Sequence, residues 1–350
     1  MIRFYCGEHE IQKYMSDPFG RRGEEKQPGT SRRRWLQALG IAGTAGLAGC
    51  TGESSTDTPA GSETETDGDA LGTATETSTR PEELPEVAGT YNSVISSPVD
   101  TLNPLYNTEY GAGNLIAYTL EMGYGFKPGN RQMPQLYELT TDEGKVWTAT
   151  VRENLQFSEP YGQVTAEDFV YLVQELHQSD WAATANSDRW PAEVTVEQTG
   201  EFEFQIELPE ANLLYPETYD PLLYPIPKAL LEPYVAEQNA EGLQQDQELL
   251  NLEFTGNLGP YTLDEWNRSS GMTFTRNEDY YLREAADQNA LFENAPYFEE
   301  LEVKVVQEQA SRLGALETGE TDTAAVPPER VSRFDGLDNV DVKIIPQPYN

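Results

Sequence analysis

The sequence predicts a folded region of mixed α/β class, and three segments support this prediction. Residues 202–208 alternate apolar and charged or polar side chains, as a half-buried strand does. Residues 301–305 show the same alternation, and we expect this second strand to belong to a different sheet. Residues 165–176 instead place apolar side chains at helical spacing. Strands and helices therefore mix along one region, which we place after residue 86.

An export signal is predicted ahead of this region. Arg32 and Arg33 precede a short apolar run at 35–49, an arrangement typical of twin-arginine signals, which direct folded proteins across a membrane. The run is not a membrane span, because a spanning helix needs about 20 mostly apolar residues. An amphipathic helix or a nucleic-acid-binding arm is the alternative, but the order of arginine pair, apolar run and cysteine favours a signal.

The end of the apolar run predicts a lipid anchor. The letters LAGC at 47–50 resemble a lipobox, the motif at which a signal peptide is cut and the new N-terminal cysteine is lipidated. We therefore expect Cys50 to hold the protein at the outer face of the cell membrane. Cys50 is then the one cysteine left, so no internal disulfide can form. Translation could start at Met1 or at Met15.

The charge of the chain excludes one class of partner. Aspartate and glutamate number 60 against 23 lysines and arginines, and the formal net charge is −37. Such a field repels phosphates, so nucleic acid is not expected as a partner. Extreme acidity with few lysines is typical of adaptation to very high salt, where screening removes most self-repulsion. An acidic disordered protein is the alternative, and the apolar periodicity disfavours it.

The residues between the signal and the folded region predict a tether. Residues 51–86 consist mainly of Ser, Thr, Glu, Asp, Gly and Pro, with almost nothing to bury. Such a segment cannot offset the entropy cost of ordering itself. Its like charges repel one another, so we expect a disordered acidic linker that holds the folded region away from the membrane.

Local patterns predict two elements in more detail. Residues 194–196 and 202–208 flank a short polar turn with Gly200, which predicts a β-hairpin. A helix is expected to begin at Thr165, with Asp168 three residues on as the acidic half of a capping box. His177, the one histidine beyond Cys50, lies beside the apolar stripe of this helix, and we interpret it as structural.

Six segments occur in an order that resembles a known family. They are LNPL at 102–105, WTATVRENLQFS at 147–158, VTAEDFVY at 164–171, GPY at 259–261 followed by Trp266, RNEDYY at 276–281, and ALETGETD at 315–322. This order resembles the extracellular solute-binding proteins of the peptide and nickel ABC-transporter family. The resemblance covers residues 88–346. Residues 158–162 and 255–259 depart from the family pattern, and both departures alter loops rather than the framework.

The resemblance implies a fold and a division of the chain. The fold would be periplasmic-binding-protein-like type II, of α/β class, in which two lobes enclose the substrate as they close about a hinge. This chain would hold the first lobe and an extra domain, with the second lobe largely missing. The expected parts are the signal peptide at 1–50, the linker at 51–86, the first lobe at 87–127 and 211–335, the inserted extra domain at 128–210, and the start of a truncated second lobe at 336–350, with a crossing strand from about 340 to 345.

The resemblance also limits which residues could bind a ligand. In peptide-binding relatives the residues that grip the termini of the ligand come from the second lobe, so no position here inherits those roles. Candidates on the first-lobe side are Asn103, Tyr106 and Asn107 after the first strand, and Tyr261 beside the hairpin that the GPY and RNEDYY segments indicate. The alternative for each is ordinary turn chemistry and core packing.

The implied function is solute capture and delivery to ABC permease subunits, without a cofactor or bound metal. Peptides are the first choice, because family members hold extended backbones by hydrogen bonds. Oligosaccharides stay open, since tyrosine-rich clefts suit them, and nickel is disfavoured because imidazoles are nearly absent. A secreted hydrolase is disfavoured because the sequence lacks the common catalytic motifs. A natural end at Asn350 would instead favour a truncated surface lipoprotein without transport activity.

Overall fold

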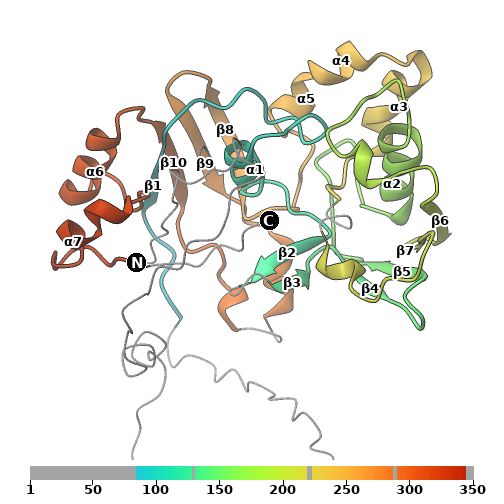
Figure 1. Ribbon diagram of the computed structural model, residues 1–350, viewed down its shortest axis with the longest axis horizontal. Coiled ribbons are helices and arrows are strands. Elements are labelled where there is room, and N and C mark those ends of the chain that lie inside the picture. The colour runs from blue at the N-terminus through green and yellow to red at the C-terminus, as the bar shows by residue number, and fades with distance from the viewer. Residues whose placement is uncertain (1–83, 128–130, 219–222, 287–289, 344–350) are drawn as a thin grey trace, which may run out of the picture. The chain divides into compact units, whose positions relative to one another are not determined.

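The structure is a computed structural model that describes residues 84–127, 131–218, 223–286 and 290–343. These residues form a mixed α/β fold with two four-stranded sheets and a two-stranded ribbon (Figure 1). The first sheet has the order β1 (Thr90–Ile95), β10 (Glu300–Val305), β9 (Gly271–Arg276) and β8 (Tyr261–Asn267). The second has the order β4 (Tyr137–Thr140), β5 (Val146–Val151), β7 (Glu203–Glu207) and β6 (Thr195–Gly200). The ribbon pairs β2 (Tyr124–Lys127) with β3 (Arg131–Pro134).

The first sheet joins segments that lie far apart in the sequence. β1 runs parallel to β10, with Tyr91 opposite Leu301, while β9 is antiparallel to both β10 and β8. Leu301 and Val303 are buried on one face of β10, as the alternation predicts. The strand predicted at 301–305 is therefore confirmed, and it lies in a different sheet from residues 202–208.

The second sheet contains the hairpin predicted around Gly200. β6 and β7 are antiparallel, with a register irregularity between Gln198 and Gly200 next to the turn. Phe204 and Ile206 are fully buried, because the alternating pattern turns both toward the core. The strands of this sheet fall within residues 128–210, and the proposed domain boundaries stay a prediction.

The helix predicted at residue 165 is confirmed as α2 (Ala166–Tyr171). The backbone N–H of Thr165 donates to the Asp168 carboxylate over 2.9 Å, which is the acidic half of the predicted capping box. The other Asp168 oxygen accepts from the N–H of Lys228, the first residue of α3, so one carboxylate serves two helix starts. Beyond Tyr171 the helix widens into a π-helix (Leu172–His177), which the periodicity does not reveal.

The remaining helices are short. The α-helices are α1 (Tyr110–Ile116), α3 (Lys228–Glu237), α4 (Ala240–Gln244), α5 (Gln247–Leu250), α6 (Gln309–Thr318) and α7 (Val331–Phe334). Single 3₁₀ turns lie at Ser187–Arg189, Tyr215–Glu217, Tyr281–Ala285, Ala290–Phe292 and Pro328–Arg330. α6 ends at Gly319 with φ of 79°, the left-handed conformation expected of a glycine cap.

Most of the buried apolar side chains form one core. It includes Phe204 of the second sheet and Phe274 of the first, so the two sheets share one apolar interior. A smaller cluster joins α6 and α7 through Leu316 and Phe334, and Val94 of β1 packs against it. Figure 1 shows α6 and α7 beside β1, on the side of the first sheet away from α2.

Several sequence predictions fall partly or wholly outside the described residues. The signal at 1–50 lies outside them, and so does the linker except for residues 84–86. Of the crossing strand expected at 340–345, residues 340–343 are described and are not a strand, because they pair with no neighbouring strand. In the described part of the chain, no helix is both long enough and apolar enough to cross a membrane.

Candidate functional site

The candidate site lies at the end of the first sheet where β1 and β10 finish. Ligands of α/β folds bind outside the carboxyl ends of parallel strands, and β1 and β10 are the parallel pair of this sheet. The turn between β8 and β9 lies at the same end, because Gly271 pairs with Lys304 near the end of β10. From that turn, Arg268 donates to the carbonyl of Asp100 over 2.9 Å. The loop that follows β1 therefore lies at this end of the sheet.

Asn103 fixes the shape of this loop. The side chain is fully buried, and its amide nitrogen donates to the carbonyl of Leu243 over 2.9 Å. Its amide oxygen accepts from the N–H of Leu105 over 3.1 Å. Both ends of the amide are thus used inside the protein, as the turn-chemistry alternative expects.

Tyr106 ties the same loop to a second loop. Its hydroxyl donates to the carbonyl of Ala182 over 2.9 Å, and the N–H of Ala185 donates to the carbonyl of Leu105 over 2.8 Å. The tyrosine is half-buried, and burial raises the pKa of its hydroxyl above the usual value. We call the two loops, residues 96–109 and 179–185, the loop junction.

The loop junction leaves two side chains near its edge accessible. Asn107 accepts from the N–H of Glu109 over 2.9 Å, and its side chain is only partly buried. Tyr110, the first residue of α1, is 77% exposed. Such a tyrosine is unusual next to a packed loop, because aromatic side chains generally find apolar contacts. The sequence analysis did not single out Tyr110.

The second loop was also missed by the sequence analysis. Ala183 has φ of 47°, a left-handed conformation that costs an alanine conformational energy. His177, at the end of the π-helix, places Nδ1 at 2.7 Å from the hydroxyl of Thr184 and so braces this loop. No residue type marks such a loop in the sequence, because an alanine in this conformation looks like any other alanine.

Tyr261 lies at the opposite end of the first sheet. It begins β8 and pairs with Arg276, the last residue of β9. Only 6% of the tyrosine is exposed, and its ring meets that of Tyr118 edge to face at 6.4 Å. Burial raises the pKa of its hydroxyl to about 12. The structure therefore brings together Asn103, Tyr106 and Asn107, but not Tyr261.

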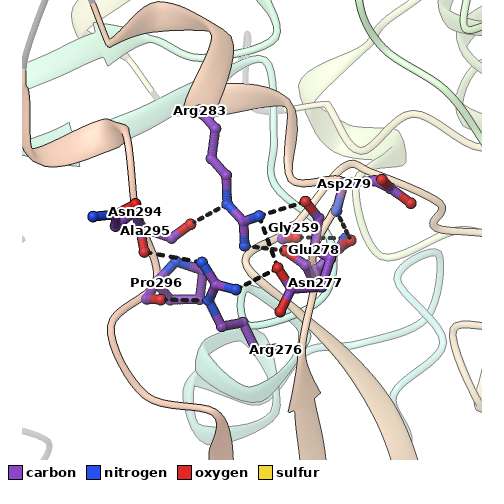
Figure 2. A network of polar contacts seen from close by, with 9 residues as sticks. All are labelled: Gly259, Arg276, Asn277, Glu278, Asp279, Arg283, Asn294, Ala295 and Pro296. Atoms are coloured by element: carbon purple, nitrogen blue, oxygen red, sulfur yellow. Dashed lines mark hydrogen bonds and ion pairs between the residues drawn. The ribbon is translucent and has the colours of Figure 1, made fainter. Parts of the chain in front are cut away.

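Polar residues of the RNEDYY segment, together with Arg283, build a network at that opposite end, which Figure 2 shows. Arg276 donates to the carbonyl of Pro296 over 2.9 Å, and Arg283 donates to that of Ala295 over 2.7 Å. Glu278 forms ion pairs with both guanidinium groups. Asn277 donates to the carbonyls of Gly256 and Gly259, each over 2.9 Å. These groups are used to join backbone segments, so the motif acts here as a framework.

The two tyrosines of the same segment hold a carboxyl group. Tyr280 and Tyr281 donate their hydroxyl hydrogens to the two oxygens of Glu121 over 2.6 and 2.5 Å. Burial of the carboxyl raises the pKa of Glu121, while both hydroxyls and the Arg152 guanidinium oppose the rise. Each oxygen of this carboxyl thus accepts a bond from a neighbouring tyrosine, and we interpret the carboxyl as a structural group.

The remaining predicted functional residues cannot be placed. Arg32, Arg33 and Cys50 lie outside the described residues. Within the described ranges, no three histidine, cysteine, aspartate or glutamate side chains come together as a metal site would require.

Comparison with known proteins identifies the family. The model for bacterial extracellular solute-binding proteins, family 5 (middle part), matches residues 132–350, and the chain belongs to this family. The nickel-binding periplasmic protein of Escherichia coli (strain K12) is 26% identical over 186 residues, which are 52% of this chain and 30% of that protein. The "Probable D,D-dipeptide-binding periplasmic protein DdpA" of the same organism is 24% identical over 209 residues, 59% of this chain and 36% of that protein.

Solved structures show the same fold. The oligopeptide-binding protein AppA of Bacillus subtilis, in complex with a nonapeptide, matches 73% of this chain and 47% of its own with a TM-score of 0.59 and 16% identity. NikZ of Campylobacter jejuni, in complex with Ni(L-His), matches 71% of this chain and 45% of its own with a TM-score of 0.55 and 16% identity. The fold is therefore periplasmic-binding-protein-like type II, and the chain spans about a third of the curated relatives and about half of these two structures.

Proposed function

We propose that this chain contributes the first lobe and extra domain of a peptide-binding component of an ABC importer. The loop junction is the observation that carries this proposal, because Tyr106 and Ala182 fix a loop at the carboxyl end of β1 and leave Asn107 and Tyr110 accessible. The amide of Asn107 offers a donor and an acceptor that match a peptide backbone. The ring of Tyr110 offers a rigid apolar surface that tolerates varied side chains.

The environment of His177 favours a peptide over nickel as the ligand. His177 is 3% exposed, and Thr184 occupies one of its ring nitrogens. A single imidazole is a poor site for nickel, and among the described residues no three histidine, cysteine, aspartate or glutamate side chains come together as such a site would require. The residues beside the loop junction thus offer amide and aromatic groups in place of imidazoles, and a second lobe would complete the cleft.

The rest of the proposal concerns location. Arg32 and Arg33 direct export through the twin-arginine route, and a lipid on Cys50 anchors the mature protein to the outer face of the membrane. The acidic linker at 51–86 spaces the folded region from the surface, and the loaded protein passes its peptide to the permease, whose partner subunits hydrolyse ATP. The family membership supports this role for the whole protein.

Binding tests the central claim. The protein extracted from its own membranes is examined by native mass spectrometry for bound peptides, and the released peptides are then titrated back by calorimetry. We expect Asn107→Ala and Tyr110→Ala each to weaken binding about tenfold, the effect of losing one good contact, with unfolding unchanged. Asn251→Ala, far along the chain at the end of α5, is the matched control. Failure to bind any peptide, or binding of oligosaccharide or nickel instead, would overturn the proposal.

Fractionation tests the location separately. Cys50→Ser should release the exported protein into the medium, and changing Arg32 and Arg33 to lysine should leave the precursor inside, because the receptor reads guanidinium groups. A Cys50→Ser protein that stays in the membrane fraction would remove the lipid anchor from the proposal while leaving peptide binding untouched.

A further inference from the structure

A hollow of about 400 Å³ lies where the π-helix ends, in the segment proposed as the extra domain. It is lined by His177, Gln178, Ser179, Asp180, Ala183, Ser187, Asp188, Trp190, Pro191 and Ala192. None of these residues belongs to the loop after β1. The volume is in the range of sites for small organic molecules and far exceeds what a bare ion needs.

An unpartnered ring nitrogen of His177 is the first feature that indicates a ligand site. Its Nδ1 lies 2.7 Å from the hydroxyl of Thr184, while Nε2 has no hydrogen-bond partner in the described part of the chain. If Nε2 were fully buried, it would be a buried polar atom without a partner. Among the described side chains the hydroxyl of Thr119 is the one such atom, so Nε2 of His177 retains contact with accessible space. His177 lines the hollow, so we infer that Nε2 faces it, although the residue as a whole is only 3% exposed.

The imidazole is neutral at ordinary pH. Burial, and then the nearby guanidinium of Arg189, lower the pKa of His177 to about 4. A neutral imidazole carries one N–H group, on Nδ1 or on Nε2. In the tautomer that donates from Nδ1 to Thr184, Nε2 is an acceptor, and this is the tautomer that an ammonium ligand would select. An acceptor that faces the hollow is available to a ligand, and an ammonium N–H group would form a charge-assisted bond with it.

The rim of the hollow favours a positive ligand. Asp180 and Asp188 line it, and neither carboxylate has an ion pair or hydrogen bond within the described residues. Arg189 is the cation beside them, and it does not line the hollow. Ala183, in its left-handed conformation, also lines the hollow, and strained backbone of this kind gathers at ligand sites.

We propose that this hollow binds the primary ammonium group of a small organic molecule, with His177 Nε2 as an acceptor and Asp180 and Asp188 as the charged partners. The site goes beyond the proposed function, because it needs neither a second lobe nor Asn107 and Tyr110, although Ser179, Asp180 and Ala183 of its lining belong to the second loop of the loop junction.

Nitrogen NMR of histidine-labelled full-length protein tests the proposal. His177 is the one histidine beyond Cys50, and a His177→Gln variant assigns its signals by their loss. The probe is n-butylammonium chloride, added at constant chloride against sodium chloride, because a chain with a net charge of −37 responds to any cation. 1-Butanol is the uncharged counterpart of the probe.

We expect n-butylammonium to shift the Nε2 signal of His177 in a saturable way, and 1-butanol to leave it unchanged. The double variant Asp180→Asn and Asp188→Asn should weaken binding at least tenfold, since charge-assisted bonds are lost. Asp142→Asn, in the β4–β5 turn, removes one exposed charge elsewhere and should bind as before. An unchanged His177 signal in folded protein, an equal shift with 1-butanol or sodium chloride, or full affinity in the double variant would overturn the proposal. Peptide binding by the native protein is measured independently, so the two proposals can fail separately.

Discussion

Tyr106 donates a hydrogen bond to the carbonyl of Ala182, a residue 76 positions further along the chain, over 2.9 Å. A second bond, from the N–H of Ala185 to the carbonyl of Leu105, lies beside it over 2.8 Å. The two bonds join the loop after β1 to a loop that follows the π-helix. Ala183, which has an unfavourable left-handed φ, lies in that second loop between the two residues that form these bonds. We therefore expect both bonds to help hold the shape of the junction.

Removing the Tyr106 hydroxyl should therefore loosen the junction. Tyr106→Phe leaves the carbonyl of Ala182 without its donor, and we expect the free energy of unfolding to fall by about 1–2 kcal/mol. Urea unfolding measures it. Tyr110→Phe is the matched control, since that tyrosine is 77% exposed and should change stability by less than about 0.5 kcal/mol. Equal losses in the two variants would show that the hydroxyl of Tyr106 does not support the junction.

The buried carboxyl of Glu121 should give stability an unusual pH dependence. Burial raises its folded pKa above the ordinary value of 4.5, although Tyr280, Tyr281 and Arg152 oppose the rise. The folded state thus binds this proton more tightly than the unfolded state does, and the contribution to stability is fully present below 4.5 and declines as pH rises through the folded pKa. Glu121→Gln does not titrate. The stability of the native protein relative to this variant should fall as pH is raised from 4 to 7, measured by urea unfolding at each pH.

Glu278, in the same region of the fold, should give stability the opposite pH dependence. Its bond with Arg276 is the main cause that holds its pKa below the usual 4.5; burial opposes this, and the bond with Arg283 adds to the lowering. This contribution is present above 4.5 and is lost as pH falls through the folded pKa. Relative to Glu278→Gln, the native protein should gain stability as pH rises, by a small amount because the carboxylate is 69% exposed. If relative stability changed with pH in the same direction in both comparisons, the pKa direction given for one of the two carboxyls would be wrong.

The sequence predicts the framework better than the site, for physical reasons. Alternation and helical spacing report burial directly, which is why the strand at 301–305 and the helix beginning at residue 165 are both found. The π-helix is missed because its side chains keep an apolar stripe similar to that of an α-helix. Tyr261 was grouped with Asn107 because residue type alone does not show that they lie at opposite ends of one sheet. The loop junction is missed because it arises from backbone carbonyls, which every residue has.

The framework role of Asn277 can be tested by truncation. Its amide nitrogen donates to the carbonyls of Gly256 and Gly259, and its oxygen accepts from the N–H of Asp279. Asn277→Ala leaves two carbonyls unpaired near the core, and we expect a loss of about 2–4 kcal/mol in unfolding free energy. Asn251→Ala, which removes an exposed bond to Glu253, should cost under about 0.5 kcal/mol. A mild effect at Asn277 would mean that water replaces its bonds.

Two glycines should respond to alanine in opposite directions. At Gly259 an added Cβ would lie 2.2 Å from the backbone carbonyl group of Thr119, a contact that no side-chain rotation can relieve. We expect Gly259→Ala to lower the unfolding free energy by about 2 kcal/mol or more, because the backbone at Thr119, after α1, and at Gly259, before β8, must separate locally. Gly314 lies in the interior of α6 with nothing within 4 Å of the added Cβ. Alanine loses less backbone entropy than glycine when it joins a helix, so Gly314→Ala should raise the unfolding free energy by about 0.5–1 kcal/mol. Both are read from urea unfolding under one set of conditions, and a stabilised Gly259→Ala protein would show that the chain at Thr119 does not pack against β8 as closely as these distances require.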